Sequence, residues 1–568
     1  MKTLIKHAEI YTLDWENTVA EALVMENGRI LQTGTEDKLQ RIYGKRMEEV
    51  DCGGRCILPA FHDSHMHLLG YGLFLNMVDL SGVKSIEELQ YRLRQFLGKY
   101  GRRKEEWIRG RGWNQDYFRE GRMPSKADLD AVSTEYPIVI SRVCGHVLVA
   151  NSKAMEICNI IKDGKLSAGA EEVWNREEQK KESLLEMIGI GEDGLPNGVF
   201  RESGMDLIYR QILDPDLETI KECLLKGQKQ LLSQGITAVQ SDDFGNVSDY
   251  KKVIQAFLEL EREGRLQIKV YEQCNLGTLS CWKEFLEEEG SLFGRKSDWE
   301  IDRNRTKIKA ESQGYFRLGC LKIVGDGSLG ARTAWLRNPY QDASDTKGIA
   351  YYKKEELYQY MSYTHNNGIP IAIHGIGDAM VEMAVDCFER LQKEYPRADL
   401  RHGIVHCQIT DDQLLRRIAK QKLMVFIQPI FLNYDLHIVE KRVGKELAQT
   451  SYNWKSLLKY GGLLSIGSDC PVETFDPMKN IYSAVTRKDL KGYPEQGFYP
   501  EQRLSVQEAV SAYTRGSVYA VYQEKQQGSL EAGKYADMVV LDQNIFQCKA
   551  QEIKDISIWK TFAGGKEI

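Results

Sequence analysis

The chain has 568 residues, more than one ordinary domain needs, so a large catalytic domain with a second domain or large insertions is expected. Its 42% hydrophobic and 28% charged residues are typical of a soluble globular protein. The net charge is −6 and the basic residues are scattered, which argues against a nucleic-acid-binding or anionic-membrane-binding face.

Targeting signals are not expected in this chain. Residues 1–14 alternate apolar and polar side chains and lack the apolar core of a signal peptide. No apolar run reaches the roughly 18 residues that a membrane span needs. The cysteines are far apart and form no CxxC pair, so we expect reduced thiols and a cytoplasmic location.

Short strands are expected at both ends of the chain. Near the N-terminus, strand-like segments separated by turn signals cover residues 4–12, 22–25 and 29–33. The same strand-like pattern occurs near the C-terminus, at residues 536–541 and 558–562. Two short β segments cannot each bury a face alone. We therefore predict one small β-sandwich domain built from residues 1–57 and 522–568.

Residues 58–521 alternate short apolar runs with longer amphipathic stretches, which is typical of a parallel sheet covered by helices. The predicted strands are 57–61, 236–240, 268–272, 321–325, 369–374, 403–406, 423–428 and 463–468. Helices are expected at 249–264, 355–366, 379–394 and 410–420, among others. This pattern predicts an α/β fold, a closed (β/α)8 TIM barrel.

The gap between the first two predicted strands is too long for a barrel loop. A plain barrel needs roughly 250 residues, so we interpret residues 70–215 as a subdomain inserted after strand 1. Loops at that end of a barrel cover the active site. The insertion is therefore expected to shape the substrate pocket.

Two histidines stand two residues apart at the end of the first predicted strand, His65 and His67. Residues at i and i+2 on a strand point to the same face, so both imidazoles can bind one metal ion. By the same parity His62 points away from them. On its own, such a pair is more often two polar residues in an exposed turn than a metal site.

Three further ionisable residues, His374, His406 and Asp469, each stand where a predicted strand ends. A single histidine there is more often a core or rim residue than a ligand. Five such groups at one end of a barrel would be costly to desolvate without a partner. A shared metal ion satisfies them together, so we predict a metal site.

Lys322 lies inside a predicted barrel strand, where an ammonium is costly to bury. It can pair with an acid such as Asp326 or form a Schiff base with a carbonyl substrate. It can also be carboxylated and bridge two metal ions. The last reading fits the neighbouring histidines best, because an ammonium would be repelled by metal ions.

These motifs resemble the amidohydrolase superfamily. Residues 58–67 (LPAFHDSHMH) resemble its first barrel strand, and lysine, histidine, histidine and aspartate follow on strands 4, 5, 6 and 8 in the superfamily's order. Residues 145–152, 325–334, 374–378, 467–472 and 528–537 resemble the amidohydrolase-3 branch, which includes N-substituted formamide deformylases. Ala60, His62 and Val405 depart from the usual glycine, aliphatic residue and glutamate.

The resemblance implies a metal-dependent hydrolase that cleaves an amide-type C–N bond, of an N-formyl or N-acyl compound, with metal-activated hydroxide. It implies zinc or another divalent metal, one or two ions, held by His65, His67, Lys322, His374, His406 and Asp469, with carboxylated Lys322 as the bridging ligand. Asp469 would also be the catalytic acid and base. A small-molecule amide is the implied partner, and a homodimer is expected.

Four further residues are candidates for the substrate site. In the branch that this chain resembles, a histidine at the position of His146 faces the active site, so His146 would bind the substrate carbonyl or oxyanion. Asp326 could orient Lys322 or contact substrate, or it could be a turn aspartate. Trp113 and Tyr117 could line an aromatic pocket, although aromatic residues of an insertion more often pack in its own core.

Three other functions stay open at this point. A deaminase or other C–N hydrolase could use the same scaffold, but such deaminases generally lack the strand-4 lysine. A non-catalytic amidohydrolase-like scaffold protein would typically have lost ligands, whereas every expected ligand position is filled here. A Schiff-base lyase would use Lys322 and would not need a metal.

Overall fold

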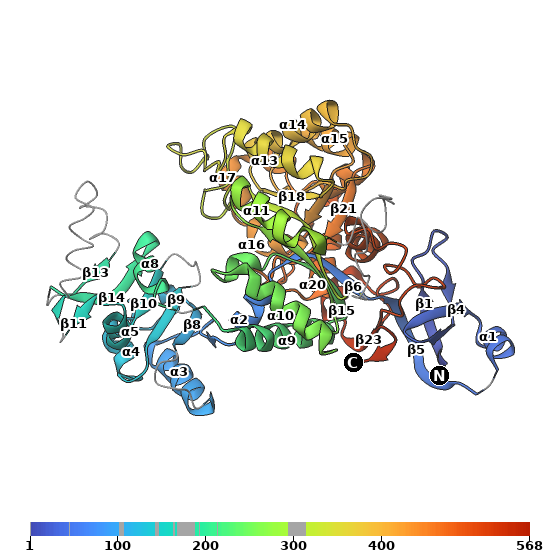
Figure 1. The fold of residues 1–568 in the computed structure, drawn as a ribbon, viewed down its shortest axis with the longest axis horizontal. Helices are drawn as coiled ribbons and strands as arrows, with labels where there is room; N and C mark the ends of the chain where they lie inside the picture. Colours follow the sequence, from blue (N-terminus) through green and yellow to red (C-terminus); the bar gives the residue numbers. More distant parts are fainter. Residues whose placement is uncertain are drawn as a thin grey trace. The chain divides into compact units, whose positions relative to one another are not determined.

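The computed structural model describes residues 2–44, 46–100, 107–142, 147–162, 165–166, 188–191, 194–212, 214–293 and 314–568. The chain divides into two compact units (Figure 1). Unit 1 combines Met1–Tyr71 with Leu217–Ile568, and unit 2 is Gly72–Asp216. Each unit is described by itself.

The centre of unit 1 is an eight-stranded parallel sheet, which confirms the predicted barrel. Its order along the chain is β6 (Phe61–Met66), β15 (Ile236–Ser241), β16 (Lys269–Asn275), β17 (Phe316–Val324), β18 (Ile371–Gly375), β19 (Gly403–His406), β20 (Met424–Ile427) and β21 (Leu463–Ile466). Each strand pairs in parallel with the next one along the chain. The carboxyl ends of all eight strands therefore lie at the same end of the barrel.

Amphipathic helices follow the barrel strands, as the sequence pattern predicts (Figure 1). The four that match the expected stretches are α10 (Tyr250–Arg262), α13 (Lys354–Asn366), α14 (Asp378–Glu394) and α15 (Asp412–Lys420). In α15 the apolar residues Leu414, Leu415 and Ile418 are buried, whereas Arg416 is exposed. One apolar face of the helix thus covers the sheet.

The first and last barrel strands are joined just beyond their carboxyl ends. The amide of Asp469 donates to the carbonyl of His65 and the amide of His67 donates to the carbonyl of Cys470, both over 2.8 Å. A Cβ atom on Gly467 would lie only 2.5 Å from the backbone nitrogen of His65, so this approach requires glycine. The closure brings the HxH segment and Asp469 together.

The first barrel strand lies further along the chain than predicted. The apolar residues Ile57 and Leu58 belong to β5 (Glu48–Pro59), a strand of the terminal β domain, and β6 begins at Phe61. The prediction of 57–61 was wrong because hydrophobicity marked the strand that fills the terminal core. The real barrel strand carries polar side chains of the site, so it lacks that apolar signal.

Both termini contribute to the second sheet of unit 1. Its order is β24 (Lys566–Glu567), β23 (Ile558–Ala563), β22 (Met538–Leu541), β5, β1 (Thr3–Tyr11), β3 (Ala22–Glu26) and β4 (Arg29–Gly34), with β2 (Val19–Ala20) paired to β1. The antiparallel pairing of β22 with β5 joins the two ends of the chain. Buried residues from both ends, among them Ile5, Ile57, Met538 and Val540, form one apolar core.

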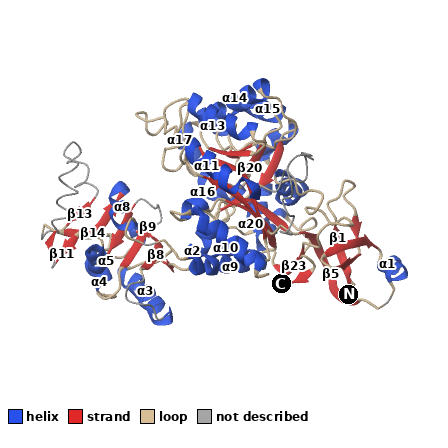
Figure 2. Ribbon diagram, viewed as in Figure 1, coloured by secondary structure: helices blue, strands red, loops and turns tan. Residues whose placement is uncertain are grey.

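Unit 2 contains a six-stranded sheet and short helices (Figure 2). The sheet order is β13 (Ile188–Ile190), β14 (Pro196–Arg201), β10 (Val147–Ala150), β9 (Ile138–Arg142), β8 (Ile108–Trp113) and β7 (Val78–Asp79). Helix α3 (Ile86–Tyr100) packs through Leu89 and Leu93 against Ile108 and Ile140 of this sheet.

In the part of the chain that the structure describes, no helix combines the length and the apolar character needed to cross a membrane.

Candidate metal centre

Three of the predicted ligands converge on one point. His65 and His67 stand at the carboxyl end of β6, and Asp469 follows β21. The Oδ1 atom of Asp469 lies 3.3 Å from Nε2 of His65 and 3.1 Å from Nε2 of His67. His65 and Asp469 are buried, and all three groups can contact one ion.

A histidine pair lies beside this triad. The rings of His374, on β18, and His406, at the end of β19, are T-shaped with centroids 4.4 Å apart. The ring of His406 is also 5.8 Å from that of His65, and Phe431 stacks on its other side at 5.7 Å. The structure thus brings together the five strand-end groups that the sequence singles out.

Two of these residues have left-handed backbone conformations, with φ of 73° at His406 and 58° at Asp469. Few residues other than glycine adopt this region, which costs an L-residue about 1–2 kcal/mol. Such conformations gather at functional sites, where the surrounding structure holds them. Here they coincide with two residues whose side chains point into the cluster.

Hydrogen bonds to one ring nitrogen orient each imidazole. His65 Nδ1 is 2.7 Å from Gln273 Oε1, and His406 Nδ1 is 2.8 Å from Gln428 Oε1. His67 Nδ1 is 2.6 Å from the carbonyl oxygen of Asp242. Because these oxygens only accept, each Nδ1 carries a proton, and Nε2 is the ring nitrogen that faces the cluster.

His374 is oriented the other way. Its Nε2 atom lies 3.2 Å from the carbonyl oxygen of Gly327, so Nε2 carries the proton and Nδ1 keeps the lone pair. The partner of this imidazole comes from the loop after β17, whereas the partner of His65 lies on β16. The four rings are thus held from four different elements.

Lys322 is a buried member of the cluster. Its Nζ atom lies 3.1 Å from Oδ2 of Asp242 and 3.3 Å from Nε2 of His65. Asp242 directly follows β15 and is itself buried. The acidic partner of Lys322 is therefore Asp242 rather than Asp326, which was one of the alternatives that the sequence left open.

Asp326 instead holds a turn. Its carboxylate accepts hydrogen bonds from the backbone amides of Trp335, Ile376 and Gly377. Burial raises its pKa to about 7, although these three amides lower it. Its Oδ1 atom is 3.4 Å from Nε2 of His374, so Asp326 supports the segment around this histidine.

Burial sets the charge state of three of the four imidazoles, those of His374, His406 and His65. It is the main cause that lowers the pKa of His374 to about 4 and places the pKa of His406 well below its usual range. Burial also lowers the pKa of His65, with the charge of Lys322 acting in the same direction. These rings are neutral near pH 7, which is the form that binds a metal.

The acidic groups make the triad favourable for a cation. Burial raises the pKa of Asp469, but the adjacent His65 and His67 side chains lower it well below its usual range. Burial lowers the pKa of His67, yet the hydrogen bond to Asp469 and the charge of Asp242 bring it to about 9. A carboxylate with converging imidazoles is the donor set that zinc and similar divalent ions prefer, and an ion bound there would displace the proton of His67, so the residues fit such an ion.

The remaining predicted site residues belong to the inserted segment. His146 lies outside the described residues, and its proposed role stays a prediction. Trp113 is fully buried in the core of unit 2 with Ile108, so it packs this unit rather than exposing a face to substrate. Tyr117 is 64% exposed, and its role also stays a prediction.

Three residues of the site were missed in the sequence, namely Asp242, Gln273 and Gln428. Each stands within two residues of the carboxyl end of a predicted strand, close to the criterion that identified the histidines. The two glutamines were missed because only histidine, lysine and acidic residues were considered as candidates. Applying the strand-end criterion to every polar residue would have found all three.

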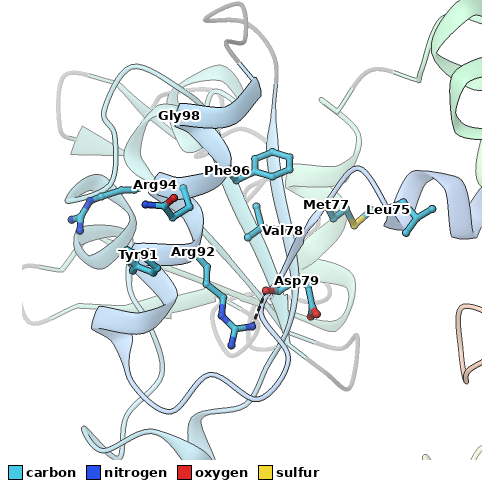
Figure 3. A pocket seen from close by; sticks show the side chains of 10 residues that line it. Leu75, Met77, Val78, Asp79, Tyr91, Arg92, Arg94, Phe96 and Gly98 are labelled. Atoms are coloured by element: carbon cyan, nitrogen blue, oxygen red, sulfur yellow. Dashed lines mark hydrogen bonds between the residues drawn. The ribbon is translucent and has the colours of Figure 1, made fainter. Parts of the chain in front are cut away.

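Unit 2 has a cavity of about 780 Å³ beside α3 (Figure 3). Its lining includes Asp79, Tyr91, Arg92 and Phe96. The guanidinium of Arg92 already donates to the carbonyl oxygens of Asp79 and Ser81 and to Glu88. The described residues that line this cavity include no histidine or cysteine, so it does not resemble the histidine and aspartate cluster of unit 1.

Comparisons with known proteins agree with this geometry. The amidohydrolase family model matches residues 48–568. The Bacillus subtilis (strain 168) protein YtcJ, named as an amidohydrolase, is 28% identical over 572 residues, covering 100% of this chain and 99% of its own. The N-substituted formamide deformylase of Arthrobacter pascens is 23% identical over 571 residues, covering 99% and 97%.

A solved structure resembles the whole chain. The crystal structure of an uncharacterized metal-dependent hydrolase from Pyrococcus furiosus has a TM-score of 0.75 and 29% identity, covering 96% of this chain and 100% of its own. The family match extends over the barrel and the C-terminal strands, and the ligand cluster lies within it. The chain therefore belongs to the amidohydrolase family of metal-dependent hydrolases.

Proposed function

We propose that this hydrolase cleaves an amide-type C–N bond of a small molecule, an N-formyl or N-acyl amine. The observation that carries the proposal is the position of buried Lys322, 3.3 Å from Nε2 of His65 and adjacent to the histidine and aspartate cluster. The relative named as an N-substituted formamide deformylase, similar over nearly the whole chain, supports this choice of substrate.

His65, His67 and Asp469 would hold one divalent ion, and His374 and His406 would hold a second. Bound there, a divalent ion supplies Lewis acidity, which polarises a carbonyl and lowers the pKa of water toward neutrality. Zinc suits nitrogen and carboxylate ligands of this kind. The chain's part would be to offer one ring nitrogen of each histidine to an ion, Nε2 in three rings and Nδ1 in His374, with the proton of His67 displaced on binding.

Lys322 would act as a carbamate, formed when its neutral amine adds to carbon dioxide and releases one proton to solvent. The carbamate would carry a negative charge on two oxygen atoms, which suits a divalent ion, and would keep one N–H group. That N–H would donate to Oδ2 of Asp242, 3.1 Å from Nζ. Asp242 would thus set the direction in which the carbamate oxygens point.

Asp469 would move the proton. Its low pKa keeps the carboxylate ionised at neutral pH, ready to accept a proton from the attacking water. It would then deliver that proton to the departing nitrogen. The delivery matters because an amide nitrogen is a poor leaving group until it is protonated.

The experiment that tests the proposal measures metal content and hydrolysis on the same preparation. Protein purified without chelator is expected to contain one or two equivalents of a divalent metal per chain and to release amine from a panel of N-formyl and N-acyl amines. Chelation should remove the metal and the activity together. Metal-free protein that also fails to bind added zinc would contradict the proposal, as would metal-loaded protein inactive on the whole panel.

A further inference from the structure

Gln273 makes two hydrogen bonds that fix the direction of its side-chain amide. Its Nε2 donates to the carbonyl oxygen of Ser64 over 3.2 Å, and its Oε1 lies 2.7 Å from Nδ1 of His65. The side chain is only 1% exposed, so water cannot substitute for either partner.

Gln428 repeats this arrangement at the other side of the cluster. Its Nε2 donates to the carbonyl oxygen of Phe426 over 3.0 Å, and its Oε1 lies 2.8 Å from Nδ1 of His406. This side chain is also buried. Gln273 lies on β16, whereas Gln428 directly follows β20.

The backbone carbonyls decide which end of each amide faces the imidazole. A carbonyl oxygen can only accept, so the NH2 group of the glutamine must face it. The amide oxygen then faces the histidine, and only the tautomer with a proton on Nδ1 can satisfy that oxygen. Nε2 is left unprotonated, directed into the cluster.

We propose that Gln273 and Gln428 are positioning residues that select the metal-binding tautomer and ring orientation of His65 and His406. The inference rests on the proposed metal function of these two histidines. Both partners are uncharged, so they fix the proton without adding charge beside the imidazoles, unlike the carboxylate partners that many metal-bound histidines have. The position before His406, where the resembled branch usually has glutamate, is Val405 here.

Gln273→Leu and Gln428→Leu test the inference, with Gln240→Leu as the matched control. Gln240 is also a buried barrel glutamine and donates to the carbonyl oxygen of Ser517, which lies outside the cluster. Gln273→Glu is the conservative variant, because a neutral carboxyl group offers one acceptor oxygen and one hydroxyl donor in the same place.

Two measurements are made on metal-free full-length protein. Nitrogen NMR of labelled histidine reports the tautomer, and zinc titration against a competing chelator reports affinity. We expect Gln273→Leu to change the tautomer signal of His65 alone and Gln428→Leu that of His406 alone. Each should weaken zinc binding about 10–100-fold, the usual effect of losing such a partner.

Gln240→Leu should change neither quantity, and Gln273→Glu should keep the wild-type tautomer and most of the affinity. Unchanged tautomers in both leucine variants would overturn the inference, and so would an equal loss of affinity in Gln240→Leu. If a leucine variant fails to fold, the other leucine variant and Gln273→Glu still decide the matter. Wild-type protein that binds no zinc would contradict the proposed function instead, while the tautomer signals would still test the two glutamines.

Discussion

The Nζ atom of Lys322 lies 3.1 Å from Oδ2 of Asp242, and side-chain exposure is 3% and 5%, respectively. The backbone carbonyl of the same Asp242 accepts the hydrogen bond of His67 Nδ1. Asp242, which follows β15, therefore supports two of the proposed ligands. Its carboxylate contacts Lys322, and its backbone carbonyl contacts His67. Substitution of its side chain leaves the contact with His67 in place.

Asp242→Asn should distinguish an ammonium from a carbamate at Lys322. Removing one partner of a buried ion pair typically costs about 3–5 kcal/mol, because the other charge stays buried. We expect such a loss of unfolding free energy in metal-free, carbon-dioxide-free protein and a much smaller loss in the metal-loaded protein. Chemical denaturation of both forms, with Lys455→Met as a half-exposed ion-pair control, measures this. Equal losses in the two forms would contradict the carbamate.

The carbamate itself can be observed directly. Metal-loaded protein equilibrated with carbon-13-labelled bicarbonate should show one carbamate carbon signal, and Lys322→Met should remove it. The same substitution should abolish hydrolysis and lower the metal content, because the bridging ligand is lost. Borohydride trapping of a carbonyl compound on Lys322 would favour the Schiff-base alternative instead.

His65→Ala should remove metal and activity while the fold is largely kept. His65 is a proposed ligand with Nε2 facing Asp469 and Lys322, so the substitution removes one of the three groups of the triad. The metal content, measured by elemental analysis, should fall together with the hydrolysis rate. His437→Ala is the control, because this half-exposed histidine pairs with Asp489 outside the cluster. Full activity of His65→Ala would remove the metal site from the mechanism.

The positions of three of the proposed ligands could be predicted from the sequence because each is a single ionisable residue where an apolar run stops. His374, His406 and Asp469 all satisfy that description, and parallel strands bring such positions to one end of a barrel. Repeated polar strand ends are therefore informative even without spacing motifs. The order of these residues along the chain carried the resemblance to the family.

Contacts that arise only from the tertiary fold, such as the acidic partner of Lys322, could not be predicted from the sequence. Asp326, four residues away, was one candidate acidic partner of Lys322, but Asp326 bonds to three backbone amides and the lysine reaches Asp242, at the end of the next-but-one strand. Strand 1 was misplaced because the apolar signal of Ile57 belongs to the terminal sheet. In both cases a tertiary contact overrode the local pattern.

A buried acid near the same end of the barrel should make stability depend on pH. Burial raises the pKa of Asp435 to about 6, although hydrogen bonds from the Tyr452 hydroxyl and the Gln408 amide lower it. Its pKa in the unfolded chain is about 4, so the folded protein binds the proton more tightly. Its contribution to stability is greatest in acid and is lost as pH rises from about 4 to about 6.

Asp435→Asn should therefore stabilise the protein near pH 7, by up to about 2 kcal/mol, because the neutral amide needs no ionisation and its oxygen still accepts from Tyr452. The gain should shrink toward pH 4. Denaturant unfolding at several pH values measures it. A loss of stability at pH 7 would show that the charged carboxylate is preferred in the folded state.

Asp469→Asn should depress turnover far more than substrate binding. The asparagine keeps an oxygen near His65 and His67, but it can no longer accept the proton of the attacking water or pass it to the leaving nitrogen. General acid–base catalysis contributes about 100- to 10,000-fold, so kcat should fall by at least about 100-fold while KM changes by only a few-fold. Because Asp469 is also a proposed ligand, metal content must be measured in the same samples, and the comparison is made at equal metal occupancy. An unchanged kcat at full occupancy would exclude Asp469 as the proton carrier, whereas a large rise in KM with kcat preserved would assign it to substrate binding.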